Sequence, residues 1–264
     1  MDTAGGGAAR PHDGTDDEIA RLRRDHTPAA IAARLARRPA HSYLRDFVYG
    51  AIDGTVTTFA VVAGVAGAGL RSSIVIVLGI ANLVADGFSM AASNFLGVRT
   101  EREQHAAARH DEHRQVALHP EGEREEIRQI LAAKGLSGDA LDSAVVAVTS
   151  DADRWVDVML TDELGLAPQL PDPVRAAATT FAAFVVVGML PLLPFVAGLL
   201  APDLIARPFG WSALATGAGF FTVGAVKGRL VGQPPTRSGL QVLAVGGAAA
   251  VLAYVAGALL GSIA

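Results

Sequence analysis

Residues 74–98 read IVIVLGIANLVADGFSMAASNFLGV, an apolar stretch in which Asp86 is the only charged residue. Because about 20 apolar residues are enough to cross a bilayer as a helix, this stretch predicts a membrane span. A carboxylate near the centre of a membrane helix costs about 2.5 to 3.5 kcal/mol on insertion scales, so it normally faces a bundle interior or a water-filled cavity. Asp86 therefore indicates an ion path, and the alternative is a polar kink buried among helices.

Other stretches have the same length and composition. The expected spans are Phe47–Leu70, Ile74–Val98, Arg175–Leu200, Trp211–Val226 and Leu240–Ile263. The first contains Asp53 within a GxxxG formed by Gly50 and Gly54, a pattern that permits close approach of helices. Apolar residues make up 51% of the chain and charged residues 18%, and the mean hydropathy is +0.36. These values predict an all-α polytopic membrane protein with five transmembrane helices.

The basic residues predict the orientation of these spans. Arg34, Arg37, Arg38 and Arg45 precede the first span, and Lys227, Arg229 and Arg237 border the connection between the last two. By the positive-inside rule the N-terminus is cytoplasmic and the C-terminus is outside. The chain then divides into a cytoplasmic tail (1–41), spans one and two (42–98), a cytoplasmic helical domain (99–172) and spans three to five (173–264). An Ala-, Arg- and Gly-rich composition without an organellar signal favours a bacterial cytoplasmic membrane.

The expected cytoplasmic parts are helical. Glu101–Leu118 continues span two, Glu121–Lys134 ends at Gly135, a third helix runs from Ser137-Gly138-Asp139 to Val148, and a fourth runs from Asp151 or Asp153 to Leu164. Gly165 ends that fourth helix. In the tail, Ile31–Arg38 is amphipathic with a basic face, which indicates a surface helix or a disordered tail.

Residues 99–172 are rich in carboxylates and imidazoles, which as ligands suit Mn, Fe, Co or Zn. Glu123 and Glu126 are spaced i,i+3, and Met159 and Glu163 i,i+4, so each pair shares one helix face. A thioether among carboxylates favours a transition metal over Mg or Ca. The alternative is a solvated acidic surface with arginine partners. The available arginines are Arg102, Arg109, Arg114, Arg124 and Arg128.

Span two carries a polar stripe, because Asn82, Asp86 and Met90 are spaced i, i+4, i+8. Other chemistries find less support. The chain has no cysteine, which excludes disulfides and thiolate zinc sites. We find no nucleophile–base pair, phosphate loop or cofactor fingerprint, so we expect neither an enzyme nor a cofactor. The arginines are interleaved with acids, which disfavours nucleic-acid binding.

From about Ser42 onward the chain resembles the vacuolar iron transporter family. The resemblance lies in Arg45-Asp46-Phe47-Val48-Tyr49-Gly50-Ala51-Ile52-Asp53-Gly54, Ser89-Met90, Trp155 with Met159, Glu163-Leu164-Gly165-Leu166, Pro191 with Pro194, and Val226-Lys227-Gly228. It implies a homodimer with the ion path at its interface and a cytoplasmic metal-binding domain between spans two and three. Its members resemble proton-coupled antiporters that move Fe(II), and often Mn(II), out of the cytosol. Co(II) and Zn(II) are further candidate ions.

Carried over by position, the resemblance places transmembrane ligands at Asp53 and Met90, and puts Asn82 where the family has a glutamate. The cytoplasmic ligands fall on Glu112, Glu123, Glu126, Met159 and Glu163, with Gln115 at a further glutamate position. Asn82 cannot carry a proton, and Asp86 lies one turn away, about 6 Å along the axis. We hypothesise that Asp86 takes over the titrating role. A membrane-anchored metal-binding or sensing protein without transport is the alternative function.

Overall fold

The computed structural model describes residues 13–36, 42–201, 205 and 207–261, and every regular element in these ranges is a helix. The chain divides into two compact units, residues 1–41 and 42–264. The first unit contains two helices, α1 (Asp13–Asp25) and α2 (Pro28–Ala36). Helix α2 overlaps the segment for which the sequence left a surface helix and a disordered tail as alternatives. The Thr27 hydroxyl accepts a hydrogen bond from the Ala30 backbone N–H and caps α2. Arg38, at the end of the expected helix, lies outside the described residues.

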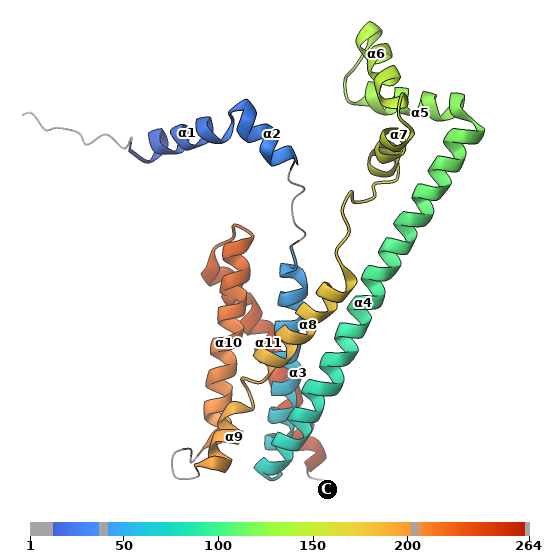
Figure 1. The fold of residues 1–264 in the computed structure, drawn as a ribbon. Helices are drawn as coiled ribbons and strands as arrows, with labels where there is room; N and C mark the ends of the chain where they lie inside the picture. The colour runs from blue at the N-terminus through green and yellow to red at the C-terminus, as the bar shows by residue number, and fades with distance from the viewer. Residues whose placement is uncertain (1–12, 37–41, 202–204, 206, 262–264) are drawn as a thin grey trace, which may run out of the picture. The chain divides into compact units, whose positions relative to one another are not determined.

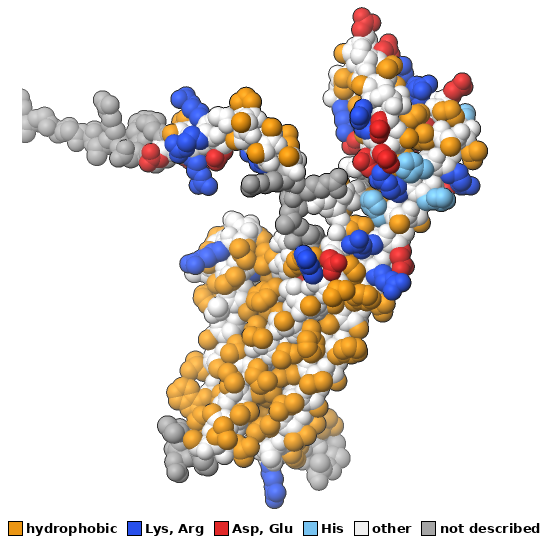
Figure 2. All heavy atoms as spheres, viewed as in Figure 1, with side chains coloured by type: hydrophobic (Ala, Val, Ile, Leu, Met, Phe, Trp, Pro, Cys, Tyr) orange, Lys and Arg blue, Asp and Glu red, His pale blue; other side chains and the backbone are white. Residues whose placement is uncertain are grey.

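The second unit contains the membrane-spanning helices (Figure 1). They are α3 (Leu44–Gly67), α4 (Ser72–Leu118), α8 (Pro173–Gly188) with α9 (Leu193–Leu200), α10 (Pro208–Leu230) and α11 (Pro235–Gly261). Among the described residues, four helices are long and apolar enough to cross a membrane, and the bent pair α8 and α9 makes a fifth span if it is counted as one. Each expected span falls on one of these helices or on the pair, and the expected end of the fifth span, Ile263, lies outside the described residues. Figure 2 shows apolar side chains covering this bundle.

Helix α3 lies at the centre of the bundle and packs against α4, α8, α10 and α11. A Cβ atom at Gly50 would collide with the backbone oxygen of Thr180, and one at Gly54 with that of Phe184. From the other side, a Cβ at Gly188 would lie 2.7 Å from the Gly54 backbone oxygen. The GxxxG of α3 therefore brings its backbone against that of α8, as small-residue interfaces do in membranes.

The third span is broken between α8 and α9, whose axes differ by 51°. Pro191 and Pro194 lie at this break, where proline prevents continuous helical hydrogen bonding. The Ser212 hydroxyl of α10 donates a hydrogen bond of 2.6 Å to the Pro191 carbonyl oxygen, and Ser212 is completely buried. This bond satisfies a backbone group that the break leaves without a helical partner, which a membrane interior requires.

Residues 99–172 form what we call the helical unit. The end of α4 continues span two as expected, and α5 (Pro120–Ala133), α6 (Gly138–Thr149) and α7 (Ala152–Val158) follow it. Ile127, Val145, Trp155 and Met159 form its apolar core. The Asp151 carboxylate accepts a hydrogen bond from the Arg154 backbone N–H and caps α7. The expected single helix to Leu164 is instead α7 followed by a π-helical turn, Met159–Glu163, because the backbone widens there to i→i+5 bonding.

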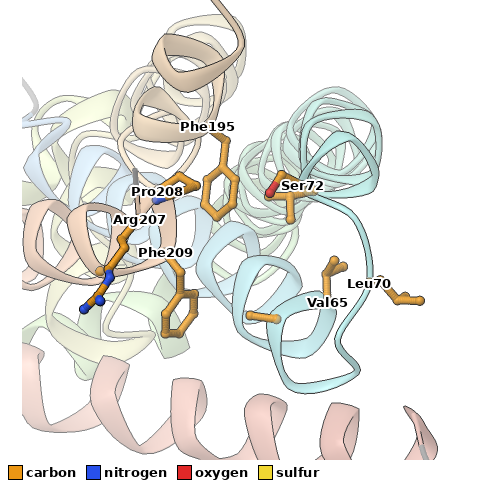
Figure 3. A pocket seen from close by; sticks show the side chains of 10 residues that line it. Val65, Leu70, Ser72, Phe195, Arg207, Pro208 and Phe209 are labelled. Atoms are coloured by element: carbon orange, nitrogen blue, oxygen red, sulfur yellow. The ribbon is translucent and has the colours of Figure 1, made fainter. Parts of the chain in front are cut away.

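A cavity of about 480 Å³ lies at the C-terminal end of α3, where the α3–α4 connection meets the start of α10 (Figure 3). Apolar side chains, among them Val65, Phe195 and Phe209, supply most of its lining, and Arg207 adds one cationic group. Val65 is twelve residues beyond Asp53, about 18 Å along the helix axis. A largely apolar lining with a cation does not suit a metal ion, so this cavity is not the candidate site.

The glycine contact between α3 and α8 predicts the effect of added volume. Gly54→Ala should lower the free energy of unfolding by about 1–3 kcal/mol, because its Cβ meets backbone atoms that cannot rotate away. The measurement is the apparent midpoint of thermal unfolding in detergent. The matched control is Gly97→Ala in α4, where a Cβ would have no neighbour within 4 Å and alanine gains up to about 1 kcal/mol of helix propensity. Equal midpoints for the two variants would contradict the packing argument.

Candidate functional site

Two carboxylates lie within electrostatic range of each other at the α3–α4 contact, within the membrane spans. Asp53 and Asp86 are both partly buried, and the charge of Asp86 acts on Asp53. Neither forms an ion pair with any residue that the structure describes. Two like charges held together without a cation are unfavourable in a medium of low dielectric constant. A divalent cation between the helices would relieve that repulsion.

Asn82 lies beside this pair and is fixed by two threonines of α3. The Thr57 hydroxyl donates to the Asp53 carbonyl oxygen at 2.8 Å, so the Thr57 oxygen is left to accept the Asn82 amide N–H at 3.2 Å. The Thr58 hydroxyl oxygen lies 3.5 Å from the same amide nitrogen. The Asn82 side-chain amide is therefore oriented with its nitrogen toward the two threonines. The amide oxygen makes no hydrogen bond to the described residues and is left as a neutral oxygen ligand.

Met90 belongs to the same stripe of α4 but has an apolar environment. It is partly buried and packs against the core cluster that contains Phe59, Leu83 and Phe184. Its thioether therefore lies one helical turn from Asp86, at the border between the polar stripe and the core. The structure brings Asp53, Asn82 and Asp86 to the α3–α4 contact, with Met90 next to it on α4.

A further buried polar cluster lies two turns nearer the start of α3, and the sequence analysis did not select it. Asp46 is 8% exposed, and its Oδ1 accepts a hydrogen bond of 2.8 Å from the Asn94 amide. The same amide donates to the Thr180 hydroxyl of α8, also at 2.8 Å. The available signal was spacing: Asp46 precedes Asp53 by seven residues, and Asn94 follows Met90 by four, so both continue polar faces already identified.

In the helical unit, four glutamates act on one another electrostatically: Glu112, Glu123, Glu126 and Glu163. None of them has an ion-pair partner in the described part of the chain. The arginines instead pair with aspartates, since Arg109 contacts Asp153 and Asp157 at 3.1 and 2.6 Å, and Arg128 contacts Asp142 at 2.6 Å. These four glutamates therefore have no arginine partner among the described residues, so the negative charge at this cluster is not paired by arginine.

Two of these carboxylates are buried. Glu112 is 4% and Glu123 5% exposed, and one oxygen of each has no hydrogen-bond partner in the structure as described. Burial, followed by the negative charges of Glu163, Glu123, Glu126 and Asp111, raises the pKa of Glu112 to about 7. Burial and neighbouring glutamates also raise the pKa values of Glu123 and Glu163. Orphaned buried oxygens with raised pKa values are typical of a ligand site.

The two remaining candidate ligands, Met159 and Gln115, make contacts with other protein groups. Met159 is completely buried in the apolar core of the helical unit beside Ile127 and Trp155. The Gln115 amide donates to Glu112 Oε1 at 3.4 Å, so it supports a carboxylate in place of adding one. Among the described residues, no group of three or more His, Asp or Glu side chains is placed to hold one metal ion. One chain thus gathers the carboxylates without forming a complete coordination shell.

Comparison with known proteins decides the family. The model of the VIT family matches residues 44–258, which include every candidate ligand. The chain belongs to the VIT family, the vacuolar iron transporters. The chain is 33% identical over 214 residues to vacuolar iron transporter 1 of Arabidopsis thaliana, covering 80% of this chain and 83% of that protein. It is 34% identical over 224 residues to the vacuolar iron transporter of Toxoplasma gondii, covering 83% and 74%. The VIT match thus covers both the spans and the helical unit.

The raised pKa of Glu112 predicts how stability depends on pH. Folding raises this pKa from 4.5 to about 7, so the folded state binds the extra proton. The resulting stabilisation is complete below about pH 4.5 and is lost as the pH rises through 7, at up to about 1.4 kcal/mol per pH unit. Thermal unfolding of the detergent-solubilised, chelator-treated protein between pH 4.5 and 8 measures it.

Glu112→Gln should flatten this pH dependence and raise the unfolding midpoint at pH 8, because the buried group can no longer ionise. The control is Glu121→Gln, which changes an exposed glutamate of the same unit and should keep the slope of the wild type. If the Glu112 variant keeps that slope too, the assignment of the titration to Glu112 is wrong.

Proposed function

We propose that this protein transports divalent transition-metal ions, Fe(II) or Mn(II), out of the cytosol in exchange for protons. The observation that carries the proposal is that Asp53 and Asp86 lie within electrostatic range of each other on two membrane-spanning helices, without a cation partner among the described residues. Membership of the VIT family supports metal-ion transport, because its relatives carry the name of iron transporters. Intramembrane carboxylates serve ion pathways and proton relays in many transporters, whereas a membrane anchor has no use for them.

The transmembrane site would work by competition between protons and metal ions. Asp53 and Asp86 supply two charges, Asn82 a neutral oxygen, and Met90 a thioether that favours transition metals. When a divalent ion sheds its water, the carboxylates compensate the loss. Protons arriving from the outer side neutralise the same carboxylates, release the ion and reset the carrier. Asp86 takes the titrating role because Asn82, hydrogen-bonded to Thr57, has no proton to exchange.

The helical unit would capture the ion first. We place it and the N-terminus in the cytosol and the C-terminus outside, following the arginine distribution, in a bacterial cytoplasmic membrane. Its four unpaired glutamates raise the local concentration of cations. Because one chain supplies no complete coordination shell among the described residues, we infer a homodimer in which a second copy completes the sites.

A flux assay tests the function. In proteoliposomes, the wild type should accumulate Fe(II) or Mn(II), and an opposing proton gradient should accelerate the uptake. Asp53→Ala should lower the initial rate by about tenfold or more, since it removes a charged ligand. Asp139→Asn, at an exposed position of α6, is the control and should transport normally. Metal binding without flux in the wild type would instead support the membrane-anchored sensing protein.

A second comparison tests the role of Asp86. Asp86→Asn should retain some metal binding but lose the dependence of flux on the proton gradient, because the amide cannot titrate. The double variant Asp86→Asn with Asn82→Glu returns a carboxylate one turn away and should restore part of that dependence. Intact proton-coupled flux in Asp86→Asn would refute the assignment.

A further inference from the structure

The buried cluster at the start of α3 contains a carboxylate that the proposed transport site does not use. Asp46 is 8% exposed and lies where α3, α4 and α8 converge. Asn94 of α4 holds its Oδ1, and Thr180 of α8 lies within reach of its backbone oxygen at 3.5 Å. The second oxygen, Oδ2, makes no hydrogen bond or ion pair with the described residues.

The neighbouring cation does not neutralise this charge. The guanidinium of Arg45 lies 5.3 Å from the centre of the Tyr49 ring, in a cation–π contact. It forms no ion pair with Asp46. The start of α3 contributes a partial positive charge through its free backbone N–H groups, since Asp46 lies in the first turn. A buried carboxylate with a single side-chain hydrogen bond remains costly unless a positive charge joins it.

The cluster lies in line with the proposed transport site. Asp46 and Asp53 are seven residues apart on one face of α3, about 10.5 Å along the axis. On the facing helix, Asn94 extends the series Asn82, Asp86, Met90 by a further four residues. The α3–α4 contact thus carries polar side chains at three successive levels: Asp46 with Asn94, Asp53 with Asp86, and Thr57 with Asn82.

We propose that Asp46 is a further station of the cation path, the carboxylate that a divalent ion meets between the helical unit and Asp53. Asn94 holds this carboxylate through Oδ1, Thr180 holds Asn94 and contacts the Asp46 backbone oxygen, and the free carboxylate oxygen binds the passing ion. The inference rests on the proposed transport function and adds a ligand to it. The competing explanation is a packing role, in which Asp46 only accepts the hydrogen bond that joins α3 to α4.

The test separates charge from hydrogen bonding. Asp46→Asn keeps an oxygen that accepts the Asn94 bond but removes the charge, and Thr180→Val removes a hydrogen-bonding partner but keeps the charge. Initial rates of Mn(II) uptake into proteoliposomes are measured over a range of Mn(II) concentrations, together with unfolding midpoints. We expect Asp46→Asn to lower the rate at low Mn(II) by about tenfold without lowering the unfolding midpoint. Thr180→Val should stay within about twofold of the wild type, and Asp46→Glu should recover part of the rate.

Two results would overturn the proposal. Normal uptake by Asp46→Asn shows that the charge is dispensable, and equal losses of rate and midpoint in Asp46→Asn and Thr180→Val show a packing role. Both results leave transport by the wild type intact, so they leave the proposed function standing. A wild type without flux overturns the proposed function, and the station at Asp46 falls with it.

Discussion

The close contact between the backbones of α3 and α8 is the constraint on which the bundle depends. Lipid tails are as apolar as leucine, so apolar side chains alone give membrane helices little reason to associate. Gly50, Gly54 and Gly188 remove the side chains that would keep these helices apart. Helix α3 then lies at the centre of the bundle. Asp53 directly precedes Gly54, the glycine that contacts α8. The position of the proposed metal site is therefore fixed by a packing requirement.

At the proposed transport site, hydrogen bonds between helices are made by neutral groups and not by the carboxylates of Asp53 and Asp86. Hydrogen bonds between neutral side chains join the helices, as between Asn82 and Thr57 and between Asn94 and Thr180. The carboxylates of Asp53 and Asp86 make no such hydrogen bonds with the described residues. In the helical unit, Arg109 and Arg128 pair with aspartates, and Glu112, Glu123, Glu126 and Glu163 have no arginine partner among the described residues. A carboxylate that is free of structural bonds can exchange a proton or an ion without loosening the fold.

The spans and most helices were predicted well from the sequence. The signals used, runs of apolar residues and glycines that end helices, depend only on residues close together in the chain. Glu101–Leu118 continues span two and Gly135 follows the end of α5, as predicted. The π-helical turn at Met159–Glu163 was missed, because no local signal separates it from an α-helix. The pairing of arginines with aspartates in preference to Glu112 or Glu123 also depends on tertiary contacts. Asp46 was overlooked because its burial comes from α4 and α8, which lie far from it in the sequence.

Helix α4 runs without interruption from Ser72 to Leu118. Asp86 and Glu112 are therefore 26 residues apart on one rod, about 39 Å along its axis. Because both residues belong to one continuous helix, the distance between them is fixed. These two carboxylates of one chain therefore cannot share an ion. Under the proposed function, an ion that leaves Glu112 therefore has to cross the distance to Asp46 and the membrane site without Glu112 as a ligand. The length of α4 thus means that the two proposed metal sites bind separate ions, or the same ion at different times.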